Sequence, residues 1–230
     1  MGEGIGNEEL LMPFINSANI ALGYHAGNEA TMQQVIELCL EHNVYIGAHP
    51  SFLDKPNFGR TEMHLPASEI YQLVTAQLDS INRIALRCGG KLHHIKPHGA
   101  LYNMAAKDAV LAKTIAQAVK DFDTSLIYYG LSGSVMITEA ANLGLQTANE
   151  VFADRTYQPD GTLTPRSLPD ALLSNTDDAV KQVVKFVNEN KVVTVTGEEI
   201  HVKADTICIH GDGRHAVKFA KAIYQKLNEK

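Results

Sequence analysis

The sequence predicts an α/β fold in which a parallel sheet, open or closed into a barrel, forms a single domain over residues 1–230. Short apolar runs alternate with amphipathic helices along the chain, as in strand–helix–strand units. No linker or low-complexity tract divides the chain, and its 45% hydrophobic and 20% charged residues are an ordinary globular composition. Barrels of this length commonly form one domain.

Five segments carry apolar side chains at helical spacing. In residues 31–41, for example, Met32, Val35 and Ile36 fall on one face. The segment 68–88 ends at Gly89-Gly90, a typical helix stop. Thr176 precedes two aspartates and is expected to cap the helix that it begins. The predicted helices cover residues 31–41, 68–88, 110–119, 176–187 and 216–227.

Apolar runs between these helices are the candidate strands. They cover residues 18–22, 44–48, 92–95, 126–129, 145–148 and 206–209, of which 145–148 is the weakest. Residues 192–195 and 200–202 flank Gly197-Glu198 and predict a small hairpin.

Charge and cysteine content exclude several classes of protein. The net charge of −6 argues against a nucleic-acid partner, and no stretch reaches the 18 apolar residues of a membrane span. Cys39, Cys88 and Cys208 are spaced too widely for a zinc knuckle or redox pair, so all three are expected to be buried. The acidic N-terminus lacks a signal core. We therefore expect a cytoplasmic protein whose homo-oligomerisation is left open.

Polar residues gather immediately after the predicted strands. In parallel α/β barrels these strand ends converge on one face, which carries the active site. A lone histidine is usually structural, but five such segments are hard to explain as strand caps alone. We therefore expect a shared cavity. The segments are residues 23–28, 47–51, 96–103, 150–155 and 210–213. The histidines without this context are His42, His64, His93, His94, His201 and His215.

At these segments the chain closely resembles the family of 5-oxoprolinase A subunits, also called the LamB/YcsF family. The matching stretches run in family order over nearly the whole chain. They are residues 17–27, 46–51, 57–60, 96–103, 150–157, 161–166 and 210–212.

The resemblance implies a seven-stranded β/α barrel related to the glycoside hydrolase/deacetylase fold. It also implies the opening of 5-oxo-L-proline (pyroglutamate) to L-glutamate with ATP and Mg²⁺, together with the B and C subunits of 5-oxoprolinase as partners. Gly2-Glu3-Gly4 matches the family, but the strand that usually precedes it does not appear. Either the start lies at an internal methionine or the first barrel strand is missing.

Opening a lactam through its phosphorylated oxygen requires a base for water, donors for the oxyanion and cations for phosphate. The candidate catalytic residues are His25, His49, Lys96, His98, Glu150 and Asp154. The candidate substrate-binding residues are Asn103, Arg155, Arg166, His210 and Asp212. Roles within each set are interchangeable, and Asp154 and Arg155 could instead form a structural ion pair.

Two other functions remain open. Histidines with a carboxylate could hold zinc in a deacetylase-like amide hydrolase, although the acid that such a site would most naturally use lies in the missing strand. Alternatively, the chain could be a non-catalytic protein that presents the lactam to a partner. No GxxxxGK[ST] phosphate loop occurs, so ATP could bind here or on a partner.

Overall fold

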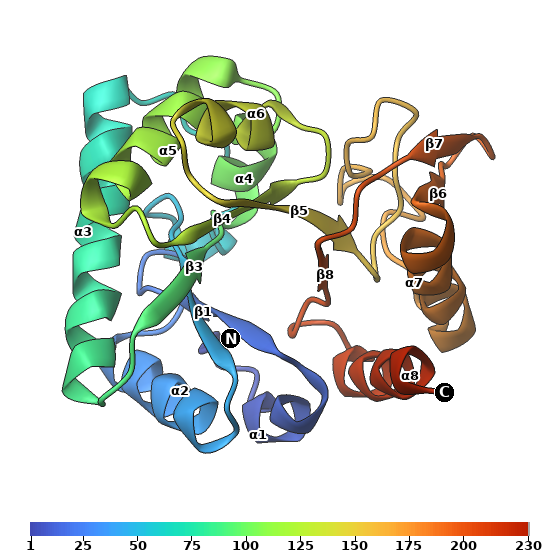
Figure 1. Cartoon of the computed structure of the whole chain (residues 1–230), viewed down its shortest axis with the longest axis horizontal. Helices are drawn as coiled ribbons and strands as arrows, with labels where there is room; N and C mark the ends of the chain where they lie inside the picture. Colours follow the sequence, from blue (N-terminus) through green and yellow to red (C-terminus); the bar gives the residue numbers. More distant parts are fainter. Residues whose placement is uncertain (230) are drawn as a thin grey trace. The chain divides into compact units, whose positions relative to one another are not determined.

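Parallel strands connected by helices make up the chain in the computed structural model, which describes residues 1–229 (Figure 1). The chain falls into two compact units. The first comprises Met1–Gly130 and Ser134–Thr147, and the second comprises Leu131–Gly133 and the chain from Ala148 onward.

The first unit is built on parallel strands in the order β1-β2-β3-β4. Ala18 lies opposite Ile46, and Ile95 lies opposite Tyr128. A register shift between Ile46 and Gly47 interrupts the pairing of β2 with β3. The strands are β1 (Ser17–Ala21), β2 (Tyr45–His49), β3 (Leu92–Ile95) and β4 (Ile127–Leu131).

Helices of this unit pack against the sheet and one another: α2 contacts β1 and β2, α3 contacts α5, and α5 contacts α6. The helices are α1 (Glu8–Leu11), α2 (Glu29–Glu41), α3 (Ala67–Arg87), α4 (Gly99–Ala105), α5 (Ala109–Phe122) and α6 (Val135–Asn142). Short 3₁₀ turns cover Met12–Phe14 and Lys55–Asn57.

Side-chain caps fix where two of these helices begin. Asn28 and Thr31 form a reciprocal capping box at α2, and Asp108 accepts hydrogen bonds from the Val110 and Leu111 amides at α5. These caps satisfy amides that have no partner within the helix. The polypeptide therefore leaves β1 and α4 along defined paths, and these paths position the loops that follow the strands.

The His94 imidazole fills the space in front of Gly47. His94 is fully buried, with its Nε2 3.0 Å from the Asn19 Oδ1 atom and its ring stacked on Tyr129. A Cβ atom added at Gly47 would overlap that imidazole. The glycine in β2 is therefore needed for His94 to pack inside the sheet.

The second unit pairs β5 (Thr147–Phe152) in parallel with β8 (Thr206–Cys208). An antiparallel pair, β6 (Lys191–Val193) with β7 (Glu199–His201), forms the predicted hairpin. Helices α7 (Thr176–Glu189) and α8 (Ala216–Asn228) pack on each other. The cap of α7 is Asn175 rather than the predicted Thr176, because the Asn175 side chain accepts the Asp177 amide.

The predicted α/β class is confirmed, but the closed seven-stranded barrel is wrong. Residues 1–229 contain a six-stranded parallel sheet in the order β1-β2-β3-β4-β5-β8, together with the separate pair β6-β7. Helices α1, α4 and α6 are additional to the predicted ones. Cys39 and Cys208 are buried as expected, whereas Cys88 is only half-buried.

None of the helices within residues 1–229 is both long and apolar enough to cross a bilayer.

Candidate functional site

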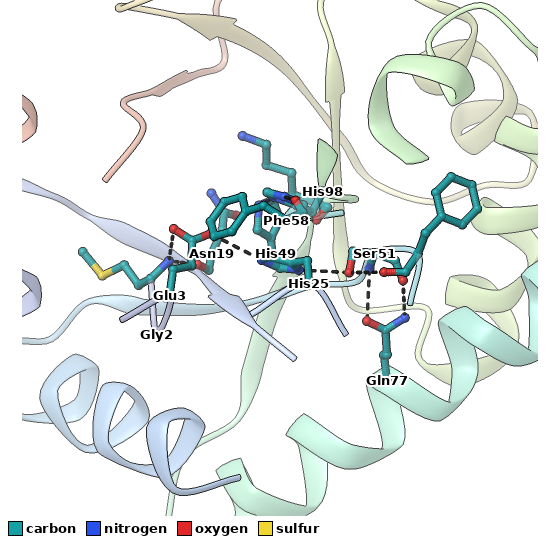
Figure 2. Close-up of polar contacts among 12 residues, drawn as sticks. Gly2, Glu3, Asn19, His25, His49, Ser51, Phe58, Gln77 and His98 are labelled. Atoms are coloured by element: carbon teal, nitrogen blue, oxygen red, sulfur yellow. Dashed lines mark hydrogen bonds and ion pairs between the residues drawn. The ribbon is translucent and has the colours of Figure 1, made fainter. Parts of the chain in front are cut away.

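Three histidines from separate strand ends meet inside the first unit (Figure 2). His25 lies in the loop after β1, His49 ends β2, and His98 follows β3. Their exposed fractions are only 1%, 8% and 8%. The carboxyl ends of neighbouring parallel strands lie along one edge of the sheet, so residues far apart in sequence come into contact there.

The rings of the histidine cluster, defined as His25, His49 and His98, contact one another directly. His25 and His98 stack with centroids 3.7 Å apart and planes 8° from parallel, and His49 meets His98 edge-on at 4.8 Å. Gly59 makes this packing possible, because a Cβ there would lie 2.8 Å from the His25 Cβ and 3.0 Å from the His98 Cδ2. Its positive φ of 65° also favours glycine.

Backbone carbonyls hold two of the rings. The Nδ1 atom of His49 lies 2.6 Å from the Lys96 carbonyl oxygen, and the Nε2 atom of His98 lies 2.9 Å from the Phe58 carbonyl oxygen. A carbonyl can only accept, so both ring nitrogens donate. The opposite nitrogens, Nε2 of His49 and Nδ1 of His98, are 3.0 Å apart.

Burial keeps this cluster uncharged. Desolvation, followed by the nearby charges of other basic groups, holds the pKa of both His49 and His98 well below the usual histidine value. Desolvation also lowers the pKa of His25, although Glu3 partly opposes this. At neutral pH the cluster therefore offers imidazole nitrogens that can accept protons or bind a metal ion.

Glu3 supplies a carboxylate to the same cluster. Its Oε1 atom lies 3.4 Å from the His25 Nε2 atom. Burial alone would raise the pKa of Glu3, but the Met1 amino group and His25 outweigh that effect, and the pKa lies below its usual value. One possible ligand atom from each of Glu3, His49 and His98 lies within 4.8 Å of the others. These three residues could hold a metal ion.

A glutamine from α3 anchors the other side of the cluster. The Gln77 side chain accepts the Ser51 amide at 3.0 Å and donates to the Ser51 carbonyl at 2.9 Å. The Ser51 hydroxyl in turn lies 2.9 Å from the His25 Nδ1 atom (Figure 2). Both Gln77 and Ser51 are buried. The helix therefore fixes the loop that positions His25.

Hydrogen bonds within one loop fix the position of the Phe58 carbonyl. The Asp54 carboxylate accepts the Asn57 side-chain amide at 2.8 Å and the Thr61 backbone amide at 3.1 Å. Phe58 adopts a left-handed conformation with φ 57°, which is uncommon for an aromatic residue. Such strain persists only where the surroundings impose it. The His98 hydrogen bond is therefore tied to this loop conformation.

Lys96 and Asn103, which were also predicted for the site, differ in burial. Lys96 is 4% exposed, and its Nζ atom lies over the Tyr102 ring, 5.5 Å from the centroid. Asn103 is an exposed residue of α4. Lys96 therefore lies in the buried part of the first unit, whereas Asn103 lies on the surface and its role stays a prediction.

In the second unit, Asp154 and His210 form a pair. The His210 Nδ1 atom lies 2.9 Å from both carboxylate oxygens of Asp154, and the His210 ring stacks on Phe152. Both residues follow strands, β5 and β8, within two positions. A carboxylate that holds Nδ1–H of a histidine leaves Nε2 as the proton acceptor. This pair can therefore transfer a proton.

The other residues predicted for the site in this unit have different surroundings. Arg155 is buried, and its guanidinium donates to the Ala171 and Thr164 carbonyls, so its contacts hold loops together. Burial and the charge of Arg166 lower the pKa of Arg155 to about 10. Glu150 is buried within β5, and Asp212 is half-buried beyond His210. The alternative of a structural Asp154–Arg155 ion pair gives way to the pair Asp154–His210.

Replacing Asp154 by Asn should make the free energy of unfolding depend less on pH below neutrality. Burial alone would raise the pKa of Asp154, but His210 outweighs it and the pKa lies below 3.8. The ionised carboxylate therefore stabilises the fold above that ordinary value, and this stabilisation is lost as the pH falls through the lowered pKa. Urea unfolding from pH 7 to pH 2 measures this. Asp79→Asn, an exposed change on α3, is the control and should keep the wild-type slope.

Glu3 and Gln77 belong to the site but were not predicted from the sequence, and Ser51 was predicted only as part of the segment 47–51. A signal existed for Gln77, since it interrupts the apolar face formed by Val74, Leu78 and Ile81 on α3. A buried polar group needs a partner, so a polar residue on such a face points to a specific hydrogen bond. For Glu3 the only signal was its place in Gly2-Glu3-Gly4.

Known proteins resemble this chain over its whole length. The sequence model of the LamB/YcsF family matches residues 1–230. A protein of Oceanobacillus iheyensis that is named as the A subunit of 5-oxoprolinase is 50% identical over 97% of this chain and 87% of its own length. A Staphylococcus haemolyticus protein of the same name is 50% identical over 100% of this chain and 94% of its own length.

A solved structure is similar as well. The lactam utilization protein from Thermus thermophilus superposes with a TM-score of 0.91 at 38% sequence identity, over 97% of this chain and 90% of that one. The fold described above is therefore shared with a protein whose name refers to lactams.

Proposed function

Because this chain belongs to the LamB/YcsF family, we propose that it is the A subunit of an ATP-dependent 5-oxoprolinase that opens 5-oxo-L-proline to L-glutamate. The name of the relatives supports this: proteins 50% identical over nearly the whole chain are called A subunits of 5-oxoprolinase. A lettered subunit belongs to a multi-subunit enzyme, and we propose the B and C subunits as its partners in the cytoplasm.

The observation that carries a catalytic role is the histidine cluster. Three imidazoles are buried at strand ends and are uncharged at neutral pH, the form in which an imidazole can accept a proton or bind a metal ion. In the other unit, the His210 ring is oriented by Asp154 for the same kind of step. The cluster brings three proton-accepting side chains into contact, which supports a hydrolase rather than a passive binding protein.

The proposed reaction consumes one ATP and two waters. ATP, when bound with Mg²⁺, supplies a phosphoryl group to the lactam oxygen, and ADP leaves. One water then adds to the ring carbon and the C–N bond breaks, which gives the acyl phosphate of glutamate. A second water releases phosphate and glutamate. His25 or His210 would accept the protons that the two waters lose, since the free nitrogens of His49 and His98 face each other.

The cluster does not fit Mg²⁺–ATP. Mg²⁺ prefers oxygen ligands and keeps several waters, whereas the donors gathered around His49 and His98 are mainly imidazole nitrogens. These residues therefore do not hold the phosphates of Mg²⁺–ATP in the proposed complex.

Reconstitution tests the proposal. The chain is mixed with the B and C subunits, ATP, Mg²⁺ and 5-oxo-L-proline, and glutamate and ADP are measured together. We expect one ADP per glutamate and no glutamate when any protein is omitted. Glutamate release by the two partners at an undiminished rate without this chain would contradict the proposal. Calorimetric binding of the lactam with no turnover in the complete mixture would instead indicate a protein that only presents the lactam.

A further inference from the structure

The hydrogen bonds of His49 and His98 fix which ring nitrogens face each other. His49 donates its Nδ1 proton to the Lys96 carbonyl, and His98 donates its Nε2 proton to the Phe58 carbonyl. Each neutral ring carries only one proton. The two nitrogens that lie 3.0 Å apart, Nε2 of His49 and Nδ1 of His98, are then both unprotonated.

Two unprotonated nitrogens at this distance repel each other unless a cation lies between them. The cation can be a shared proton or a metal ion. A shared proton would be held by these two ring nitrogens alone, whereas a metal ion can also be bound by a third donor. A metal ion instead uses both lone pairs, and neutral imidazole is the form that binds metals.

A third donor lies beside these nitrogens. One ligand atom each of Glu3, His49 and His98 lies within 4.8 Å of the others, and the Glu3 side chain is only 10% exposed. Two imidazoles and one carboxylate are a usual ligand set for zinc and related divalent ions. The negative charge of Glu3 also offsets part of the charge of a bound ion.

The surrounding hydrogen bonds match what metal sites require. Metal-binding histidines commonly donate their other N–H to a carbonyl or carboxylate, which fixes the tautomer and the ring orientation. The Lys96 and Phe58 carbonyls do this for His49 and His98. His25 completes the shell, since it stacks on His98 and lies 3.4 Å from Glu3.

We propose that Glu3, His49 through Nε2, and His98 through Nδ1 bind one divalent transition-metal ion of the zinc class. Three protein ligands leave a fourth position for water or for an oxygen of a substrate. This site goes beyond the proposed lactam-opening function and does not depend on it, because it concerns the isolated chain without nucleotide or partner.

Metal titration tests the site. The purified full chain is stripped with a chelator and dialysed, then titrated with Zn²⁺ by calorimetry. We expect one Zn²⁺ per chain, and at least about 100-fold weaker binding for Glu3→Gln and for His98→Asn, because loss of a direct ligand should exceed the effect of losing an outer partner. His42→Gln, an exposed histidine at the end of α2, should bind as the wild type does.

Co²⁺ and NMR give readouts that do not depend on activity. Co²⁺ should give visible d–d absorption in the wild type and in His42→Gln but not in His98→Asn. Imidazole ¹⁵N spectra should show ligation at Nε2 of one histidine and Nδ1 of another. Circular dichroism of each variant establishes that it is folded; if His98→Asn is not, Glu3→Gln carries the test.

Three results would overturn the site. These are no stoichiometric Zn²⁺ uptake by the folded wild type, equal uptake by the folded variants, or a far-downfield proton resonance from a shared His49–His98 proton that persists when Zn²⁺ is added. Each would leave glutamate release by the reconstituted complex unaffected. Conversely, a failed reconstitution would leave a measured Zn²⁺ site standing.

Discussion

Replacing His98 by Ala should reduce glutamate release by the reconstituted complex at least about 100-fold, the lower end of what a positioned acid–base group contributes. His98 stacks on His25, faces the His49 Nε2 atom and donates to the Phe58 carbonyl, so its loss removes one ring and the support of two others. The measurement is steady-state turnover at saturating ATP and lactam. Lys96→Ala, at the end of β3, should also abolish turnover.

The control for this experiment is His42→Ala. His42 caps the end of α2 and its side chain is exposed, so turnover should be unchanged. Thermal unfolding of each variant shows whether lost turnover reflects lost structure. If folded His98→Ala and Lys96→Ala both retained wild-type turnover, the histidine cluster would not be the catalytic site.

Replacing Gly47 by Ala should destabilise the protein by about 2–4 kcal/mol, as expected for overpacking a filled core and disturbing a buried hydrogen bond. The new methyl group would overlap the His94 imidazole, which is fully buried and bonded to Asn19. Burial also lowers the pKa of His94 to about 3, so this ring is neutral and cannot gain a compensating charge. Urea unfolding at pH 7 measures the loss.

A double-mutant cycle separates this clash from a general effect of alanine in β2. In a His94→Ala background the overlapping ring is gone, so Gly47→Ala should cost much less there, and the two changes should be strongly non-additive. Gly213→Ala is the matched control, since its Cβ would meet the His210 carbonyl oxygen no closer than 3.4 Å. Additive costs for Gly47 and His94 would contradict this account of the packing.

Much of the fold follows from local pattern. The alternation of apolar runs with helical faces located β1, β2, β3 and the hairpin within a residue or two of their observed positions. It did not locate α4, because that short helix begins inside the polar strand-end segment of residues 96–103. Helix α7 begins at Thr176, and the residue that caps it is Asn175 rather than Thr176.

The site was only partly predictable, for a different physical reason. Placing His25, His49 and His98 at strand ends required only the rule that parallel strands share an edge. The residues that hold these rings are specified by tertiary contacts, as with Gln77 on Ser51 and Glu3 beside His25. Arg155 illustrates the converse: its charge indicated a ligand, whereas its guanidinium holds backbone carbonyls.

The acceptors that set the proton positions on His49 and His98 belong to the main chain of Lys96 and Phe58. Changing either side chain leaves its carbonyl oxygen in the molecule. Alanine substitutions at Lys96 and Phe58 would therefore not reveal that these two residues determine the tautomers of His49 and His98. Random mutagenesis should instead detect this dependence at neighbours that steer the polypeptide path, above all Gly59 and Asp54.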